Sequence, residues 1–306
     1  MPKIVYVPRQ FAADTLALVE RCNAIIAEYT AQGFVLTLRQ LYYQLVSRDV
    51  IRNRQTEYKR LGGIVSDARL AGLIDWLAIE DRTRDLRQQP HWDGPSSIVQ
   101  ACAEQFRIDM WKGQQWRPEV WIEKDALTGV IEGVCNTWGV PYFSCRGYTS
   151  QSEMWVAAQR LKGHTRRGQK PVVLHFGDHD PSGKDMTRDI VDRLELFMGG
   201  VPVNRLALNM EQVREFNPPP NPAKTTDSRY AAYIAEFGDE SWELDALEPA
   251  VISGLIEAAV RGLLDMTAWQ AAEKVVAQHR SGLRRVAEDW DEVAEWLRER
   301  GSADEE

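Results

Sequence analysis

The chain of 306 residues is poor in cysteine and contains no long apolar run. Its cysteines form no C-x-x-C pair, so we expect reduced structural thiols in a cytosolic protein. They are Cys22, Cys102, Cys135 and Cys145. No apolar stretch reaches the roughly 18 residues that a membrane span needs, and the first residues lack the layout of a signal peptide. These absences predict a cytoplasmic protein with no membrane partner.

Positive charge is also scarce, since 37 basic residues stand against 45 acidic ones and the net charge is −8. The shortage is local: residues 236–306 hold 18 acidic and 7 basic side chains, and the 235 residues before them carry a small positive excess. A DNA-binding face in the first two thirds is therefore permitted, although the net charge does not require one. A cytoplasmic protein that binds DNA would be associated with the nucleoid.

The first third of the chain is predicted to form a small helical domain. Amphipathic patterns and boundary residues predict helices over residues 12–32, 38–48 and 55–71. The charged, irregular stretch 76–92 that follows is consistent with a hairpin or wing. Three helices followed by a wing favour a winged-helix, DNA-binding domain over residues 1–112.

From residue 113 onward, short apolar runs alternate with helical stretches four times. The runs lie at 120–122, at 140–145, near Val172 and near Leu206. This alternation predicts an α/β domain over residues 113–250, in which helices flank a parallel sheet. Beyond it we expect an acidic helical extension over residues 251–306. Its apolar stripe would serve packing or dimerisation, and consists of Val286, Trp290, Val293 and Leu297.

The most informative segment is Gly177-Asp-His-Asp-Pro-Ser-Gly183, which follows an apolar run. Side chains two residues apart on extended backbone point the same way, so Asp178 and Asp180 can face one point. Glu123 ends another apolar run, and the carboxyl ends of parallel strands meet at one edge of a sheet. Three such carboxylates favour a site for Mg²⁺, for which Mn²⁺ can substitute, with no organic cofactor. The alternative is that they cap helices or turns.

A helix is expected directly after this segment. Ser182 and Asp185 have the spacing of a capping box, which would place a helix N-terminus beside the carboxylates. Its free N–H groups could hold a phosphate together with Lys184, and Lys124 next to Glu123 is a second candidate for this role. The stretch is not a nucleotide-binding P-loop, because five residues separate its glycines and an aspartate follows its lysine.

A tyrosine lies beside the apolar stripe of the predicted helix 38–48. Tyr42 falls on the stripe and is expected in the core, whereas Tyr43 lies next to it. Arg39 is one turn earlier and shares the face of Tyr43. A phenol is a poor nucleophile near neutral pH, but a nearby guanidinium favours phenolate and can contact a phosphate. The spacing alone leaves packing, hydrogen bonding and catalysis open for Tyr43.

Basic side chains recur on or beside the next helix. They are Arg48, Arg52, Arg54, Lys59, Arg60 and Arg69, and acidic residues are interspersed among them. A solvated face and a DNA-binding face are equally compatible with this series.

Two later features allow more than one interpretation. Asn217-Pro-Pro-Pro-Asn-Pro222 is predicted to be a stiff surface linker, and the alternative is a loop that touches DNA or a partner. Glu243 and Asp245 could add to a second metal, but exposed acids on a helix surface are the commoner case.

Several segments together resemble a known family. Glu123-Lys124 and the Gly177–Gly183 segment are similar to the metal-binding motifs of toprim domains. The Asp-Pro-x-Gly ending resembles the A subunit of DNA topoisomerase VI and its meiotic double-strand-break relative. Thr37-Leu-Arg-Gln-Leu-Tyr-Tyr43 resembles that family's winged-helix motif, in which an arginine precedes the catalytic tyrosine by four residues. Trp242-Glu-Leu-Asp-Ala-Leu247 resembles a stretch after the toprim core, and the chain as a whole is similar to compact versions carried by phages and mobile elements.

This resemblance implies Mg²⁺-dependent cleavage of double-stranded DNA by tyrosine transesterification. Tyr43 would become joined to the 5′ end, Arg39 would steady it, and Glu123, Asp178 and Asp180 would hold the metal. It also implies a homodimer, with tyrosine and metal site from different subunits, and in some members a separate ATPase subunit. The alternatives are a toprim nuclease that uses water, a non-catalytic DNA-binding module and, fitting less well, a toprim primase.

Overall fold

The computed structural model describes residues 3–80 and 89–303, which form two compact units. The described residues of the larger unit are 3–80 and 117–262, and those of the smaller unit are 89–116 and 263–303. These bounds differ from the sequence-based divisions at 112 and 250. The difference arises because a segment near residue 100 pairs with a late helix, while the helix after residue 249 still belongs to the larger unit.

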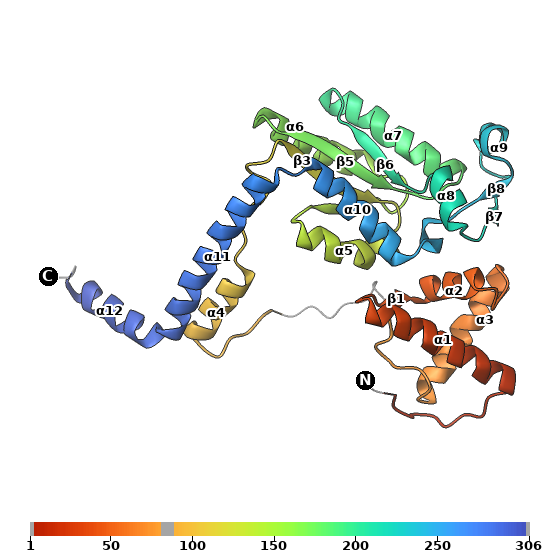
Figure 1. Ribbon diagram of the computed structural model, residues 1–306, viewed down its shortest axis with the longest axis horizontal. Helices are drawn as coiled ribbons and strands as arrows, with labels where there is room; N and C mark the ends of the chain where they lie inside the picture. Colours follow the sequence, from red (N-terminus) through yellow and green to blue (C-terminus); the bar gives the residue numbers. More distant parts are fainter. Residues whose placement is uncertain (1–2, 81–88, 304–306) are drawn as a thin grey trace. The chain divides into compact units, whose positions relative to one another are not determined.

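The three predicted N-terminal helices are present in the larger unit (Figure 1). They are α1 (Ala13–Ala31), α2 (Leu38–Ser47) and α3 (Gln55–Leu70). Strands β1 (Leu36–Thr37) and β2 (Ile79–Glu80) pair in parallel. Part of the predicted wing, residues 81–88, lies outside the described residues.

Helix α2 begins where its sequence predicts. The Thr37 hydroxyl accepts from the Gln40 N–H, and the Gln40 side chain accepts from the Thr37 N–H at 2.8 Å, which closes a capping box. Leu41 and Leu45 are fully buried in the core shared with α1 and α3. Burial of this apolar stripe fixes the rotation of α2 about its axis, and with it the directions of Arg39 and Tyr43.

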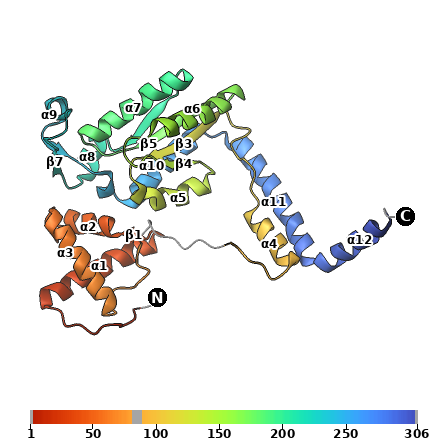
Figure 2. The same cartoon turned by 180° about the vertical axis from the view of Figure 1, so that it is seen from behind.

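The predicted parallel sheet is confirmed, with strand order β4-β3-β5-β6. Its strands are β3 (Trp116–Ile122), β4 (Tyr142–Ser144), β5 (Lys170–Phe176) and β6 (Val203–Ala207). Its helices are α5 (Thr128–Thr137), α6 (Gln151–Arg166), α7 (Pro181–Met198) and α10 (Pro249–Leu263). Figures 1 and 2 show α6 and α7 on one face of the sheet and α5 and α10 on the other.

The turn from β5 into α7 is a short junction that carries both aspartates. Asp180 is the N-cap of α7, accepting from the Gly183 N–H at 2.6 Å, and Pro181 takes the first helical position. The predicted capping box is therefore wrong: the Ser182 hydroxyl donates to Asp180, and Asp185 instead binds Tyr148 and arginine side chains. A Cβ on Gly183 would lie 2.2 Å from the Asp178 carbonyl oxygen, so this close approach requires glycine.

The chain after β6 returns to the carboxyl edge of the sheet. It forms α8 (Met210–Phe216), β7 (Asn221–Pro222), α9 (Tyr230–Phe237), β8 (Glu240–Ser241) and the 3-10 turn η2 (Leu244–Ala246). Strands β7 and β8 pair antiparallel. The proline-rich segment is therefore not a free linker, because it ends in a strand and contacts the helical domain through Asn53.

The smaller unit is a helical pair with an added helix. Helix α4 (Pro95–Gln105) packs along α11 (Met266–Glu288), and α12 (Trp290–Ala303) follows. Trp111 is fully buried against Trp269, and Arg280 donates to the Phe106 carbonyl oxygen. None of the helices described has the length and apolar character needed to cross a membrane.

Gly183→Ala should destabilise the larger unit by about 2 kcal/mol or more, because the methyl group overlaps a backbone oxygen that cannot move independently. Gly133→Ala in α5 is the matched control. Nothing lies within 4 Å of a Cβ there, so the variant should gain about 0.5–1 kcal/mol from the better helix former. Urea denaturation measures both, and equal stabilities for the two variants would contradict the close contact at Gly183.

Candidate functional site

Two of the three predicted carboxylates meet at the carboxyl ends of β3 and β5. Glu123 directly follows β3, and its Oε2 accepts from the Asp178 N–H at 2.8 Å. Glu123 is 9% exposed and Asp178 is 7% exposed. Gly177 makes this approach possible, since a Cβ there would lie 3.0 Å from Glu123 Oε2. As predicted from the strand ends, Glu123 lies beside residues 177–180, which are called the aspartate loop below.

Asp180 lies on the same loop but uses one oxygen for another purpose. Its Oδ1 accepts from the Gly183 N–H and from the Ser182 hydroxyl, and its Oδ2 is 3.8 Å from Lys224 Nζ. The capping alternative is thus realised for Asp180. In the described part of the chain, no three acidic, histidine or cysteine side chains are gathered closely enough to hold a metal ion as they stand.

The electrostatics of this edge are dominated by buried negative charge. Burial, followed by the charge of Asp178, raises the pKa of Glu123 to about 7. Burial also raises the pKa of Asp178. Buried carboxylates side by side disfavour ionisation unless a cation compensates them. Hard oxygen ligands of this kind suit Mg²⁺ or Mn²⁺, so the donor set fits the predicted metal.

Part of the compensation comes from Lys124. Its Nζ lies 2.9 Å from Asp178 Oδ1, 2.8 Å from Glu243 Oε2 and 3.2 Å from Asp245 Oδ2. Burial alone would lower the pKa of this ammonium group, but the three carboxylates reverse the effect and raise it. The residue predicted to bind a phosphate is thus held among acids in this structure.

Glu243 and Asp245 belong to this network and not to a helix surface. They flank Leu244 at the turn η2. The Leu244 N–H donates to Asp178 Oδ1 at 2.7 Å. Asp245 is only 2% exposed, so the surface interpretation is wrong for it. Burial would raise the pKa of Glu243, but Lys124 and then Arg39 lower it to about 2.

No sequence signal pointed to Arg205, yet its guanidinium binds the backbone of the aspartate loop. Its guanidinium donates to the carbonyl oxygens of Gly177, Asp178, Gly183 and Leu208 and to the Thr187 hydroxyl. Burial lowers the pKa of Arg205 to about 10, against the nearby charges of Glu123 and the two aspartates. One side chain therefore fixes both ends of the loop and adds a positive charge next to it.

The candidate nucleophile Tyr43 is 5% exposed. Burial, followed by the charge of Glu243, raises the pKa of Tyr43 to about 12, although a hydrogen bond with Asn221 acts the other way. The Arg39 guanidinium lies 5.8 Å from the centroid of the Tyr43 ring and forms ion pairs with Glu243 and Asp245. In this arrangement the phenol is protonated and Arg39 is held by acids.

Tyr43 nevertheless opens onto a cavity that reaches the aspartate loop. The cavity has a volume of 490 Å³. The helical domain contributes Arg39, Tyr42, Tyr43, Asn53, Gln55 and Tyr58 to its walls, and the sheet domain contributes Asp180, Asn221, Pro222, Lys224, Ser241 and Glu243. The tyrosine and one candidate metal ligand thus line the same space within one chain.

The basic residues predicted to bind DNA have different surroundings. Arg69 is engaged inside the protein, donating to the carbonyl oxygens of Trp76 and Ile79. Arg60 pairs with Glu57 at 2.7 Å, and the Lys184 ammonium lies 5.1 Å from the centroid of the Phe237 ring. The three that remain exposed, with no ionic partner in the described residues, are Arg52, Arg54 and Lys59.

The two histidines beside the loop do not form a metal pair. His175 Nδ1 bonds the Thr187 hydroxyl, and His179 Nδ1 bonds the Tyr233 hydroxyl at 2.8 Å. His179 is fully buried against the rings of Phe237 and Trp242, so it points away from the carboxylates.

Comparisons with models of known protein families, with curated proteins and with solved structures give no significant match to this chain.

Glu123→Gln should reveal the buried charge through pH. The fold raises the pKa of Glu123 from 4.5 to about 7. Protonated Glu123 therefore stabilises the folded state, and this contribution is fully present below pH 4.5 and is lost as the pH rises through 7. In EDTA at pH 8 the free energy of unfolding of the Gln variant should be higher than that of the parent by on the order of 1–3 kcal/mol. This difference should disappear near pH 4. Urea titrations at both pH values test this, and a parent more stable at pH 8 contradicts it.

Arg205→Met should cost about 3 kcal/mol or more, because it leaves buried carbonyl oxygens unpaired and removes a charge that offsets the acids. Arg188→Met on α7, where the side chain is 62% exposed, is the control and should change stability by less than about 0.5 kcal/mol. A similar, small change in stability at both positions would contradict the structural role of Arg205.

Proposed function

We propose that this protein cleaves the phosphodiester backbone of DNA in a reaction that depends on a divalent cation. The observation that carries the proposal is the meeting of Glu123 and Asp178 at the carboxyl ends of two neighbouring parallel strands, where both are buried. Lys124 and Arg205 offset this charge only in part, since the pKa of Glu123 stays raised, and buried titratable groups of this kind are candidates for a functional site.

Glu123, Asp178 and Asp180 would hold the cation, with Mg²⁺ as the expected ion and Mn²⁺ as a substitute. Asp180 would use the oxygen that does not cap α7. When bound there, the cation would orient a phosphate and neutralise charge that develops on its oxygens. Lys124, now among three carboxylates, would then be released from part of its ion-pair network and become available to a phosphate.

Transesterification by Tyr43 is the first route. The phenol gives up its proton as its oxygen attacks a backbone phosphorus, the P–O3′ bond breaks, and the 3′ oxygen takes up a proton, which leaves Tyr43 joined to the 5′ phosphate. Arg39, one turn before it, would steady the phenolate and the phosphate. Because the phosphotyrosyl bond conserves the energy of the phosphodiester, the strand can be resealed. This route is the activity implied by the resemblance to the topoisomerase VI A subunit.

The same resemblance bears on the assembly. It implies a homodimer that cuts both strands, with each tyrosine acting at the metal site of the other subunit, and a possible separate ATPase. In this chain Tyr43 and Asp180 already line one cavity, which also supports attack within one subunit. The double-stranded DNA substrate and the dimer belong to the proposal.

Hydrolysis by water is a second candidate, favoured by a specific observation. Tyr43 is buried and its pKa is raised to about 12, so its phenol is not activated in the arrangement seen here. In a nuclease that uses water, Tyr43 would be a structural residue, and the products would carry no protein.

Incubation of supercoiled plasmid with the protein and Mn²⁺ or Mg²⁺, followed by a detergent quench, separates the two routes. Transesterification predicts DNA-linked protein, lost by at least about 100-fold in Tyr43→Phe and retained in Tyr42→Phe, the neighbouring tyrosine that serves as the matched control. Glu123→Gln should abolish cleavage while preserving the fold.

Nicking that survives Tyr43→Phe but is lost in Glu123→Gln and Asp178→Asn would instead establish the water route. DNA binding with no cleavage under any metal condition would contradict both routes and leave a non-catalytic DNA-binding module.

A further inference from the structure

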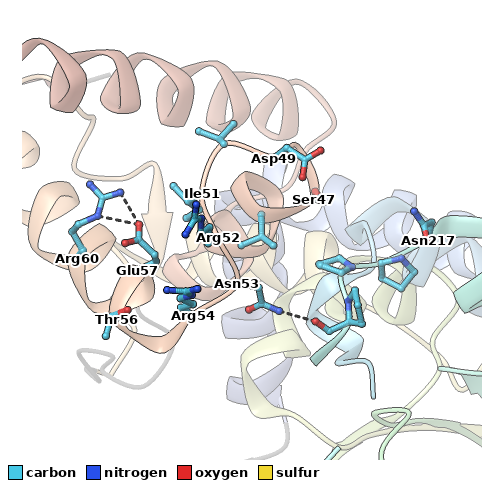
Figure 3. A pocket seen from close by; sticks show the side chains of 15 residues that line it. Ser47, Asp49, Ile51, Arg52, Asn53, Arg54, Thr56, Glu57, Arg60 and Asn217 are labelled. Carbon is cyan, nitrogen blue, oxygen red and sulfur yellow. Dashed lines mark hydrogen bonds and ion pairs between the residues drawn. The ribbon is translucent and has the colours of Figure 1, made fainter. Parts of the chain in front are cut away.

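A second and larger cavity lies between the loop from α2 to α3 and the proline-rich segment. Its volume is 810 Å³. Figure 3 shows Arg52, Asn53 and Arg54 on one side of it and Asn217 on the other. Pro218, Pro219 and Pro220 complete the second wall. Both walls are thus built from segments whose sequences allowed either a surface role or a contact with DNA.

The charge in this cavity is positive and partly uncompensated. Arg52 and Arg54 are exposed and form no ion pair within the described residues. Arg60 also lines the cavity, but its guanidinium is paired with Glu57 at 2.7 Å. Asp49 is the remaining acid in the lining, so two free guanidinium groups stand against one carboxylate. Planar guanidinium groups of this kind match the geometry of a phosphate.

The shape limits what can enter. The volume lies within the roughly 300–1,000 Å³ typical of pockets for small molecules and cofactors, so a nucleotide unit fits and an intact duplex does not. On the opposite wall Pro219 is partly exposed and Pro220 is exposed, so a sugar or base can pack against these two rings. We propose that this cavity binds a nucleotide of an unpaired DNA strand, with its phosphate on Arg52 and Arg54 and its sugar or base against Pro219 and Pro220.

The cavity is next to the one that contains Tyr43. Asn53 lines both, and its Nδ2 donates to the Pro220 carbonyl oxygen at 3.0 Å and to Asn221 Oδ1 at 2.6 Å. Its Oδ1 accepts from the Tyr42 hydroxyl at 3.0 Å. A strand anchored at the arginines would therefore continue past Asn53 toward Tyr43 and Asp180. This path rests on the proposed DNA cleavage, whereas binding in the cavity can be tested without it.

Binding is measured in EDTA, where no divalent cation supports cleavage, by the fluorescence anisotropy of a labelled single strand of about 12 nucleotides and of its blunt duplex. The parent should bind the single strand more tightly than the duplex. Arg52→Ala combined with Arg54→Ala should weaken single-strand binding at least ten-fold and reduce its salt slope by about 1.4, the value for two lost phosphate contacts.

Two further variants separate the cavity from a general attraction of charges. Thr56→Trp adds bulk to an exposed lining residue without changing charge, and should weaken binding as strongly as the arginine variant if the strand enters the cavity. Arg166→Ala is the matched control, because this exposed arginine lies at the end of α6 that leads into the start of β5, away from the carboxyl edge. It should bind as the parent does, and thermal unfolding confirms the fold of each variant.

Unchanged binding in the double arginine variant would overturn the proposal, as would full binding by Thr56→Trp or an equal loss for the blunt duplex. A parent that binds no single strand would overturn it as well. A protein that binds as proposed but never cuts plasmid would retain this site and lose the proposed cleavage, so the two failures are distinguishable.

Discussion

The arrangement depends on placing carboxylates together at the edge of a buried sheet. Glu123 and Asp178 reach the same edge because β3 and β5 are parallel neighbours, and the hydrogen bond between them brings Glu123 Oε2 to 3.0 Å from the position of a Cβ at residue 177. The charge is tolerated because Lys124 contacts one side of the loop and Arg205 holds the other. These two cations stabilise the loop by offsetting its negative charge. Burial, followed by the charge of Asp178, still raises the pKa of Glu123, so the compensation is incomplete.

The helical domain is coupled to this charge through α2. Arg39 reaches across to Glu243 and Asp245, which are also partners of Lys124, so one acidic turn connects both domains of the larger unit. Burial, followed by the charge of Glu243, raises the pKa of Tyr43, and the charge of Arg39 acts the other way. Any cation that takes over the carboxylates from Lys124 would redistribute this network, and both Glu243 and Arg39 act on the tyrosine. The protonation of the buried Tyr43 and the charge at the sheet edge are therefore coupled through one network of ion pairs.

Much of this fold could be predicted locally. Helix α2 begins at the expected residue, where Thr37 and Gln40 close a capping box, and the apolar runs become the expected parallel strands. The failures involve long-range contacts. Arg205 lies 27 residues beyond Asp178 with no motif around it, and Asp245 is buried only because η2 folds back onto Lys124. One local interpretation was also wrong: spacing assigned the helix cap to Ser182, whereas Asp180 caps α7 through Oδ1.

The most direct test of the account is titration of the full-length protein with Mn²⁺ by isothermal calorimetry at pH 7.5, with Asp178→Asn and Glu123→Gln as matched neutral variants. The account predicts saturable binding to the parent, competition by Mg²⁺, and binding at least ten-fold weaker in both variants. Absence of binding to the parent, or equal binding by all three proteins, would contradict a cation site at the carboxyl edge of β3 and β5.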